Sequence, residues 1–174
     1  MLLDGLVDPD KLKLVYEPRY TATAAEVFET RKANCLAFTS LFVGMARAIG
    51  IPAFFLDVDD VERFEKEGDL VVVSGHVSAG YATGPDLKIL DFSAAPQTGY
   101  RKVHPISDLT AIALFHSNRG GELLRAGKHD EALPWLAKAV AIDPELPGAW
   151  INYGVSLRRS GDPVKAEEAY RKAL

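Results

Sequence analysis

The chain has 174 residues, of which 48% are hydrophobic and 25% charged, as is typical of a globular protein with one domain or one domain and a small appendage. Its formal net charge of −4, with no segment dominated by Lys or Arg, argues against nucleic acid as a partner. A single cysteine excludes an internal disulfide and is compatible with a reducing compartment.

The N-terminal sequence MLLDGLVDPDKLKL contains acidic residues from Asp4 onward, before an apolar core of signal-peptide length develops. The longest apolar stretch, 36–56, carries Arg47 and is interrupted by Gly50 and Pro52. It therefore predicts a buried helix followed by a strand and not a membrane span. We expect a cytoplasmic protein without membrane association, unless an export signal precedes the given start.

Two helices are expected in the first third of the chain. Thr23 followed by Glu26 is a capping-box pattern that opens a helix over TAAEVFETR. Asn34 is a good N-cap and Gly50 a good stop for a second helix, whose sequence CLAFTSLFVGMARAIG is apolar almost all round. A helix of this kind lies at the centre of a core and not on its surface.

Strands are expected after these helices. The sequence PAFFLDV over 52–58 predicts one strand, and DLVVVSGHVSAGYATGPDLKILDFS over 69–93 predicts two more, joined by a turn at TGPD. The charged segment DDVERFEKEGD over 59–69 is expected to form a helix or a solvated loop. The segment 105–115 then leads into the C-terminal region.

The two strands of the expected hairpin carry His76 and Asp91. A four-residue loop over 83–86 places Ser78 opposite Asp91, and a two-residue loop over 83–84 places His76 opposite Asp91. In both registers His76 and Asp91 point to the same sheet face, because side chains alternate with period two. A three-residue loop would direct them to opposite faces.

Cys35 is expected in the first turn of the apolar helix. Free backbone N–H groups and the helix dipole stabilise an anion at such a position, which favours a reactive thiolate. A histidine nearby can pair with a thiolate and later protonate a leaving amine, and a carboxylate can hold the tautomer of that histidine. Cys35, His76 and Asp91, on a helix, a strand and the following strand, form one such set.

These segments resemble the transglutaminase-like superfamily, a papain-like group of cysteine enzymes. The resemblance rests on NCLAFTSLFVGMARAIGIPA, SGHVSAGY and LKILDFS, and it spans about residues 20–95. It implies an α+β, papain-like core in which a central helix bearing the cysteine packs on a small antiparallel sheet. Cys35 would be the nucleophile, His76 the general base and acid, and Asp91 the orienting group. The backbone N–H of Cys35 is the expected oxyanion donor.

This resemblance implies thiol acyl transfer on an amide, which ends in hydrolysis, as in a peptidase or amidase, or in transfer to an amine. The alternative is a non-catalytic scaffold that keeps an inactive transglutaminase-like domain, because a lone cysteine on an apolar helix is more often an inert core residue. Burial of Cys35 behind Phe38, Phe54 or Tyr81 would favour that alternative. Without a second cysteine, a close histidine pair or a calcium-loop pattern, we expect no metal and no cofactor.

The C-terminal third of the chain repeats itself at a spacing of 34 residues. Gly120 and Gly154 would let two helices approach closely, and Gly127 and Gly161 suit a left-handed helix end. Pro144 would close the second helix of the first repeat. The aligned pairs are Asn118 and Asn152, Gly120 and Gly154, Leu123 and Leu157, Gly127 and Gly161, Ala132 and Ala166, Leu136 and Tyr170, and Ala139 and Ala173.

This pattern resembles the tetratricopeptide repeat family. It implies an all-α module over 106–174, with repeats at about 113–146 and 147–174, after a transglutaminase-like domain over 1–105. The second repeat is incomplete, and arrays generally need about three units. We therefore expect a further cover, supplied by a continuation of the natural chain, by the N-terminal domain or by another chain.

The repeats imply a protein or peptide partner, and a second copy of the chain is one such partner. Asn118 and Asn152 occupy the same position on the first helix of each repeat, which faces the groove in related arrays, so they are candidates for binding a peptide backbone. The alternative for both is a polar residue on a solvated face. The expected partners are thus a protein or peptide substrate and a protein bound by the repeats.

Overall fold

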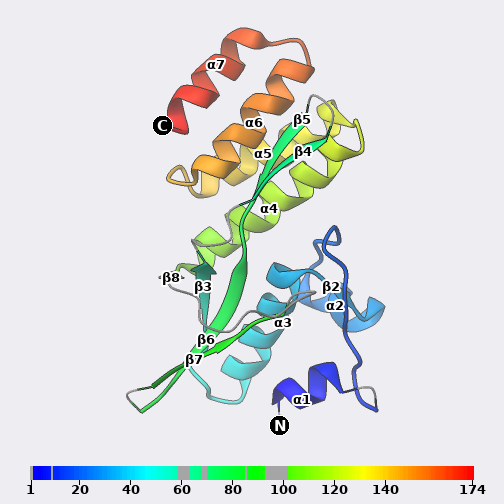
Figure 1. The fold of residues 1–174 in the computed structure, drawn as a ribbon, viewed down its shortest axis with the longest axis vertical. Coiled ribbons are helices and arrows are strands. Elements are labelled where there is room, and N and C mark those ends of the chain that lie inside the picture. Colours follow the sequence, from blue (N-terminus) through cyan, green and yellow to red (C-terminus); the bar gives the residue numbers. More distant parts are fainter. Residues whose placement is uncertain (1, 9, 59–62, 68–69, 85, 93–101) are drawn as a thin grey trace. The chain divides into compact units, whose positions relative to one another are not determined.

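A computed structural model describes the chain apart from residues 1, 9, 59–62, 68–69, 85 and 93–101 (Figure 1). The chain forms two compact units, one of residues 1–61 and 76–107 and the other of residues 62–75 and 108–174. Compared with the expected division after residue 105, the second unit also contains the segment 62–75.

The first unit begins with two short helices and two short strands, continues with a long helix, and ends with the strands of a sheet. In chain order these are α1 (Leu2–Val7), β1 (Val15–Tyr16), α2 (Ala24–Thr30), β2 (Lys32–Ala33), α3 (Cys35–Ala48), β3 (Phe54–Val58), β6 (Val77–Thr83), β7 (Asp86–Leu90) and β8 (Val103–Ile106). The second unit contains β4 (Arg63–Glu67), β5 (Leu70–Ser74), α4 (Asp108–Arg125), α5 (His129–Ile142), α6 (Pro147–Arg159) and α7 (Pro163–Lys172).

Both helices expected from capping signals are present. The Thr23 hydroxyl accepts the N–H of Glu26 at 3.3 Å and the Glu26 carboxylate accepts the N–H of Thr23 at 2.7 Å, so the capping box at the start of α2 is complete. Asn34 caps α3 by accepting the N–H of Ala37 at 2.8 Å. These predictions are confirmed.

The first unit is built around a four-stranded antiparallel sheet with the strand order β7–β6–β3–β8. Helix α3 contacts the two central strands, β6 and β3, and most of its side chains are buried. The expected mixture of helix and small antiparallel sheet, followed by a helical C-terminal block, is confirmed (Figure 1).

Strands β6 and β7 pair with Ala82 opposite Leu87 and Thr83 opposite Asp86. Continued by one step beyond Ala79 and Leu90, this register places Ser78 opposite Asp91, as in the first of the two registers considered. His76 directly precedes β6 and Asp91 directly follows β7, so both lie at the ends of strands and not inside them.

The segment between β3 and β6 differs from the prediction. Residues 63–67, expected as helix or loop, form β4, which pairs antiparallel with β5 in a separate two-stranded sheet. The single strand expected from residue 69 onward is interrupted at Gly75 and His76, so β5 and β6 belong to different sheets. Three successive valines, 71–73, have a high strand propensity. The charged residues 63–67 form a strand because they pair with the strand that contains these valines.

Strand β8 is a further difference, because the segment was expected only to lead into the helices. It pairs with β3 at the edge of the sheet, with Pro105 opposite Leu56. Proline is tolerated in an edge strand, because the side that lacks an N–H donor need not join the ladder.

The second unit is called the helical unit below. Its four helices form two pairs, α4 with α5 and α6 with α7. A Cβ atom added to Gly120 would lie 2.4 Å from Cγ of Leu136, and one added to Gly154 would lie 2.4 Å from Cε1 of Tyr170. Close helix approach at these glycines is therefore confirmed. In the part of the chain that the structure describes, no helix combines the length and the apolar character needed to cross a membrane.

The close approach at Gly154 predicts a specific loss of stability. Gly154→Ala should lower the free energy of unfolding by about 1–3 kcal/mol, because the new methyl group overlaps the Tyr170 ring. Chemical denaturation followed by circular dichroism measures the change. Gly44→Ala is the matched control: this helical glycine has open space around its Cβ position, so alanine should stabilise by about 0.5–1 kcal/mol. Equal stability of Gly154→Ala and the natural chain would contradict this interpretation.

Candidate active site

Cys35 is the first residue of α3 and is partly exposed. The side-chain amide of Asn34 fixes the start of this helix through two hydrogen bonds. Its oxygen accepts the N–H of Ala37, and its Nδ2 donates to Oγ1 of Thr21 at 2.8 Å. Both Asn34 and Thr21 are buried. Cys35 is therefore held at the positive end of the 14-residue helix, and the residue as a whole is not fully buried.

His76 is 6% exposed, and its backbone is fixed by neighbouring elements. Its carbonyl accepts the N–H of Val58 from β3 at 3.0 Å. The carbonyl of the next residue, Val77, accepts the hydroxyl of Thr39 from α3 at 3.3 Å. Thr39 lies one turn after Cys35, so the helix that carries the thiol also holds the start of the histidine strand.

The imidazole of His76 pairs with the carboxylate of Asp91. The distance from Nε2 of His76 to Oδ1 of Asp91 is 2.5 Å, and the two side chains are 8% and 7% exposed. Ser78 adds a second contact to this pair: its hydroxyl donates to Oδ1 of Asp91 at 3.5 Å and lies 3.4 Å from Nε2 of His76. The register of β6 and β7 is what brings these three side chains to one face.

Burial alone would lower the pKa of His76, but hydrogen bonds with Asp91 and Cys35, together with the charges of both groups, raise it to about 9. The ring is thus in contact with the thiol as well as the carboxylate. The structure therefore brings together all three residues of the expected set. At neutral pH this site favours the imidazolium, which places a positive charge beside the Cys35 sulfur.

Aromatic stacking fixes the segment that carries Asp91. The ring of the next residue, Phe92, stacks on Phe38 of α3, with centroids 4.3 Å apart and an interplanar angle of 13°. Tyr16 meets the same ring edge-on at 5.6 Å. Because Phe38 lies only three residues after Cys35, one helix again anchors both the nucleophile candidate and the residue beside the carboxylate.

Three contributors to the site were not predicted as functional residues: Ser78, Thr21 and Phe92. For Ser78 a signal was present, because it lies two residues after His76 on the same strand and opposite Asp91 in the observed register. Thr21 and Phe92 act through contacts with residues distant in the sequence, which no local pattern indicates.

The two asparagines proposed for peptide binding lie in the helical unit and differ from each other in environment. Asn152 on α6 is 1% exposed, and its Nδ2 donates to the hydroxyl of Ser117 on α4 at 3.4 Å. Asn118 on α4 is partly exposed. Asn152 is therefore not the solvated polar residue of the alternative, and the peptide-binding role of both residues stays a prediction.

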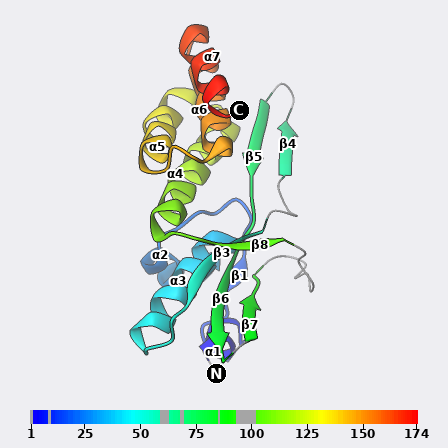
Figure 2. The same cartoon turned by 90° about the vertical axis from the view of Figure 1, so that its left-hand side faces the viewer.

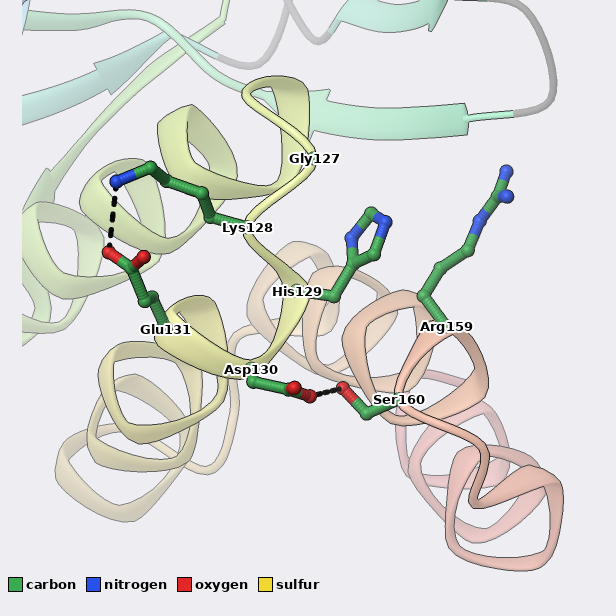
Figure 3. Close-up of a pocket in the computed structure, with 7 residues that line it drawn as sticks. All are labelled: Gly127, Lys128, His129, Asp130, Glu131, Arg159 and Ser160. Carbon is green, nitrogen blue, oxygen red and sulfur yellow. Dashed lines mark hydrogen bonds and ion pairs between the residues drawn. The ribbon is translucent and has the colours of Figure 1, made fainter.

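An open hollow of about 350 Å³ lies at the turn between α4 and α5, next to the end of α6 (Figure 3). Two of its polar contacts are an ion pair, with Nζ of Lys128 3.2 Å from Oε2 of Glu131, and a hydrogen bond that the Ser160 hydroxyl donates to Asp130 at 2.6 Å. None of the predicted site residues lines it. The lining residues are Gly127, Lys128, His129, Asp130, Glu131, Arg159 and Ser160.

Among the residues that the structure describes, no group of three or more His, Cys, Asp or Glu side chains lies close enough together to hold a metal ion. The chemistry available at the site is that of the thiol, the imidazole and the carboxylate.

The raised pKa of His76 predicts how stability depends on pH. Its folded value of about 9 exceeds the ordinary 6.5, so its contribution is fully present below pH 6.5 and is lost as pH rises through about 9. At about 1.4 kcal/mol per pH unit, the loss is about 3 kcal/mol. Urea denaturation between pH 6 and pH 9.5 measures it. His76→Asn should remove this slope, and an equal slope in both proteins would refute the assignment to His76.

Comparison with family models assigns the two parts of the chain. The model of the transglutaminase-like superfamily matches residues 10–58, which include Cys35 and end before His76 and Asp91. The tetratricopeptide repeat model matches residues 123–174, from the second half of α4 onward. No curated protein matches the chain. No solved structure matches it either. The chain thus combines a transglutaminase-like segment with tetratricopeptide repeats.

Proposed function

We propose that this protein is a thiol acyl-transfer enzyme that acts on an amide. The observation that carries the proposal is the buried His76 ring, which contacts Asp91 on one side and the partly exposed Cys35 on the other. A nucleophile, a general acid and base, and an orienting carboxylate in mutual contact are what thiol acyl transfer requires. The match of residues 10–58 to the transglutaminase-like superfamily supports the same chemistry.

In the first half of the proposed reaction, the Cys35 thiolate attacks the carbonyl carbon of the amide and a C–S bond forms. In this proposal the backbone N–H of Cys35, at the start of α3, donates to the developing oxyanion. Nε2 of His76 donates to Asp91, which leaves Nδ1 to deliver the proton to the leaving amine. The C–N bond breaks, and a thioester on Cys35 remains.

In the second half, water or an amine attacks the thioester. His76 takes the proton from the attacking group, the C–S bond breaks, and the product leaves as an acid or as a new amide. Asp91 keeps the ring oriented and stabilises the imidazolium at both stages, and the hydroxyl of Ser78 satisfies part of the Asp91 carboxylate. The acceptor is therefore either water or an amine, and both routes use the same three residues.

We further propose that the helical unit recruits the protein or peptide on which the site acts. Tetratricopeptide repeats suggest interaction with a protein, and these repeats are part of the same chain as the thiol. A purely non-catalytic scaffold would be favoured by a covered cysteine, whereas Cys35 is partly exposed.

Alkylation of the thiol tests the proposed Cys–His pair directly. Iodoacetamide should label Cys35 quickly at pH 6.5, because a His76 imidazolium beside the sulfur favours its attack. His76→Ala should slow labelling at least about 10-fold at pH 6.5. His104→Ala, which removes a half-exposed histidine from β8 of the same unit, is the control and should label normally. Equal labelling rates of all three proteins at pH 6.5 would overturn the proposal.

Turnover separates the roles of the three residues. With amide substrates and hydroxylamine as the acceptor, formation of a hydroxamate reports acyl transfer, and release of the acid reports hydrolysis. Cys35→Ser should abolish both, and Asp91→Asn should lower kcat by about 10²–10⁴-fold because the ring loses its orientation. Asp86→Asn, an exposed carboxylate on β7, should leave kcat unchanged. Activity that survives Cys35→Ser would exclude Cys35 as the nucleophile.

A further inference from the structure

The His116 ring is buried where α4 packs on α5, two helices that lie side by side in the helical unit (Figure 2). Only 9% of the residue is exposed, and its ring centroid lies 5.4 Å from that of the Trp135 ring of α5, at an interplanar angle of 38°. The Phe115 ring meets both of these rings edge-on. The imidazole is thus in contact with aromatic surface and has no part in the proposed acyl transfer.

No hydrogen bond compensates for the burial of Nδ1 in this imidazole. Nδ1 of His116 is buried and has no hydrogen-bond partner among the residues that the structure describes. In a neutral imidazole one ring nitrogen carries no proton, whereas both nitrogens of an imidazolium do. A protonated His116 would therefore hold a buried N–H donor without an acceptor, and such a donor is most costly when the group is charged.

Cations of α4 and α5 lie beside this ring. Lys138 of α5 acts on the ionisation of His116 as a like charge. The guanidinium carbon of Arg119 lies over the Trp135 ring, 5.6 Å from its centroid, and Arg119 pairs with Glu122 at 3.4 Å. An aromatic ring attracts a cation. An imidazolium at His116 would nevertheless be the second cation beside Trp135, and Arg119 already uses the nearby carboxylate.

The remaining charges on the elements that contact α4 do not neutralise the ring. Strand β5 has no titratable residue, and those of α6 are Tyr153, Arg158 and Arg159, with both arginines in its last turn. The other titratable residues of α5 lie in its first turn, at 129–131. Within the described part of the chain, no carboxylate pairs with His116.

The second repeat has a residue that does not titrate at the same position. At the 34-residue spacing, His116 corresponds to Trp150 and Lys138 corresponds to Lys172. Nζ of Lys172 lies 4.5 Å from the centroid of the Trp150 ring, and Nε1 of Trp150 donates to the carbonyl of Pro144 at 2.8 Å. The lysine attracts the indole in the second repeat. Its counterpart in the first repeat would repel an imidazolium.

We propose that His116 makes the first helix pair acid-sensitive: protonation of its ring loosens α4 from α5, while the second pair, with Trp150 at the equivalent position, keeps its packing. Burial, together with the charge of Lys138, lowers the pKa of His116 below its ordinary value of 6.5, so the folded pair favours the neutral ring. The contribution of the neutral ring to stability is therefore present above pH 6.5 and is lost as pH falls below that value. This direction is opposite to that at His76, and the proposal does not depend on acyl transfer at Cys35.

Hydrogen exchange of the full chain locates the effect. Mass spectrometry compares the protection of α4 and α5 with that of α6 and α7 at pH 7.5 and pH 5.5, corrected for the intrinsic pH dependence of exchange. Carboxylates with ordinary pKa values of about 4 stay ionised at both pH values. Between pH 7.5 and pH 5.5, protection of α4 and α5 should fall at least about threefold relative to that of α6 and α7.

Two variants assign this fall to His116. His116→Phe keeps an aromatic ring that cannot take up a proton, so it should abolish the relative fall. His104→Phe replaces a half-exposed histidine of β8, in the other unit, and should retain it as the matched control. A natural chain without the fall, or an equal fall in His116→Phe, would contradict the proposal.

A titration of the natural chain requires no variant. NMR spectra follow the rings of the four histidines between pH 4.5 and pH 8. The His116 signal should titrate with a midpoint below pH 6.5, and the indole signal of Trp135 should move with the same midpoint because the two rings are in contact. A His116 midpoint at or above pH 6.5 would overturn the proposal whatever the exchange data show.

Discussion

The candidate site depends above all on the register of β6 and β7. Thr83 pairs with Asp86, so the turn is short, and Gly84 takes a φ of 62° that most residues adopt poorly. A slip of one residue would turn either His76 or Asp91 to the opposite sheet face and separate the imidazole from the carboxylate. The chemistry at the end of the sheet is thus set by a turn at the far end of the same hairpin.

Electrostatic balance is the second requirement, because the site buries groups that carry charge. Burial opposes the imidazolium of His76, and the carboxylate of Asp91 and the neighbouring Cys35 reverse that effect. With desolvation counted, the partners still favour the imidazolium, and removing one of them would leave an uncompensated buried charge. The same contact with Asp91 also fixes the orientation of the ring. Of the three residues, Cys35 is the one that is only partly buried.

The parts of the fold that the sequence predicts are those with local signals. Thr23 and Asn34 mark helix starts through their own backbone hydrogen bonds, and Gly154 marks a close helix contact by its repeat position. The strand character of 63–67 and the pairing of β8 could not be found in this way, because both depend on strands distant in the sequence. The same holds for the Phe92 ring on Phe38, which positions Asp91 through a contact across the core.

The division between β5 and β6 falls directly beside His76. The chain passes from the helical unit to the sheet between Gly75 and His76, immediately before the candidate general base. On the sheet side this link is anchored at once, because Val58 donates to the carbonyl of His76 and Thr39 donates to that of Val77. Neither bond involves β5. The backbone of His76 is therefore held by β3 and α3, elements of the unit that also carries Cys35 and Asp91.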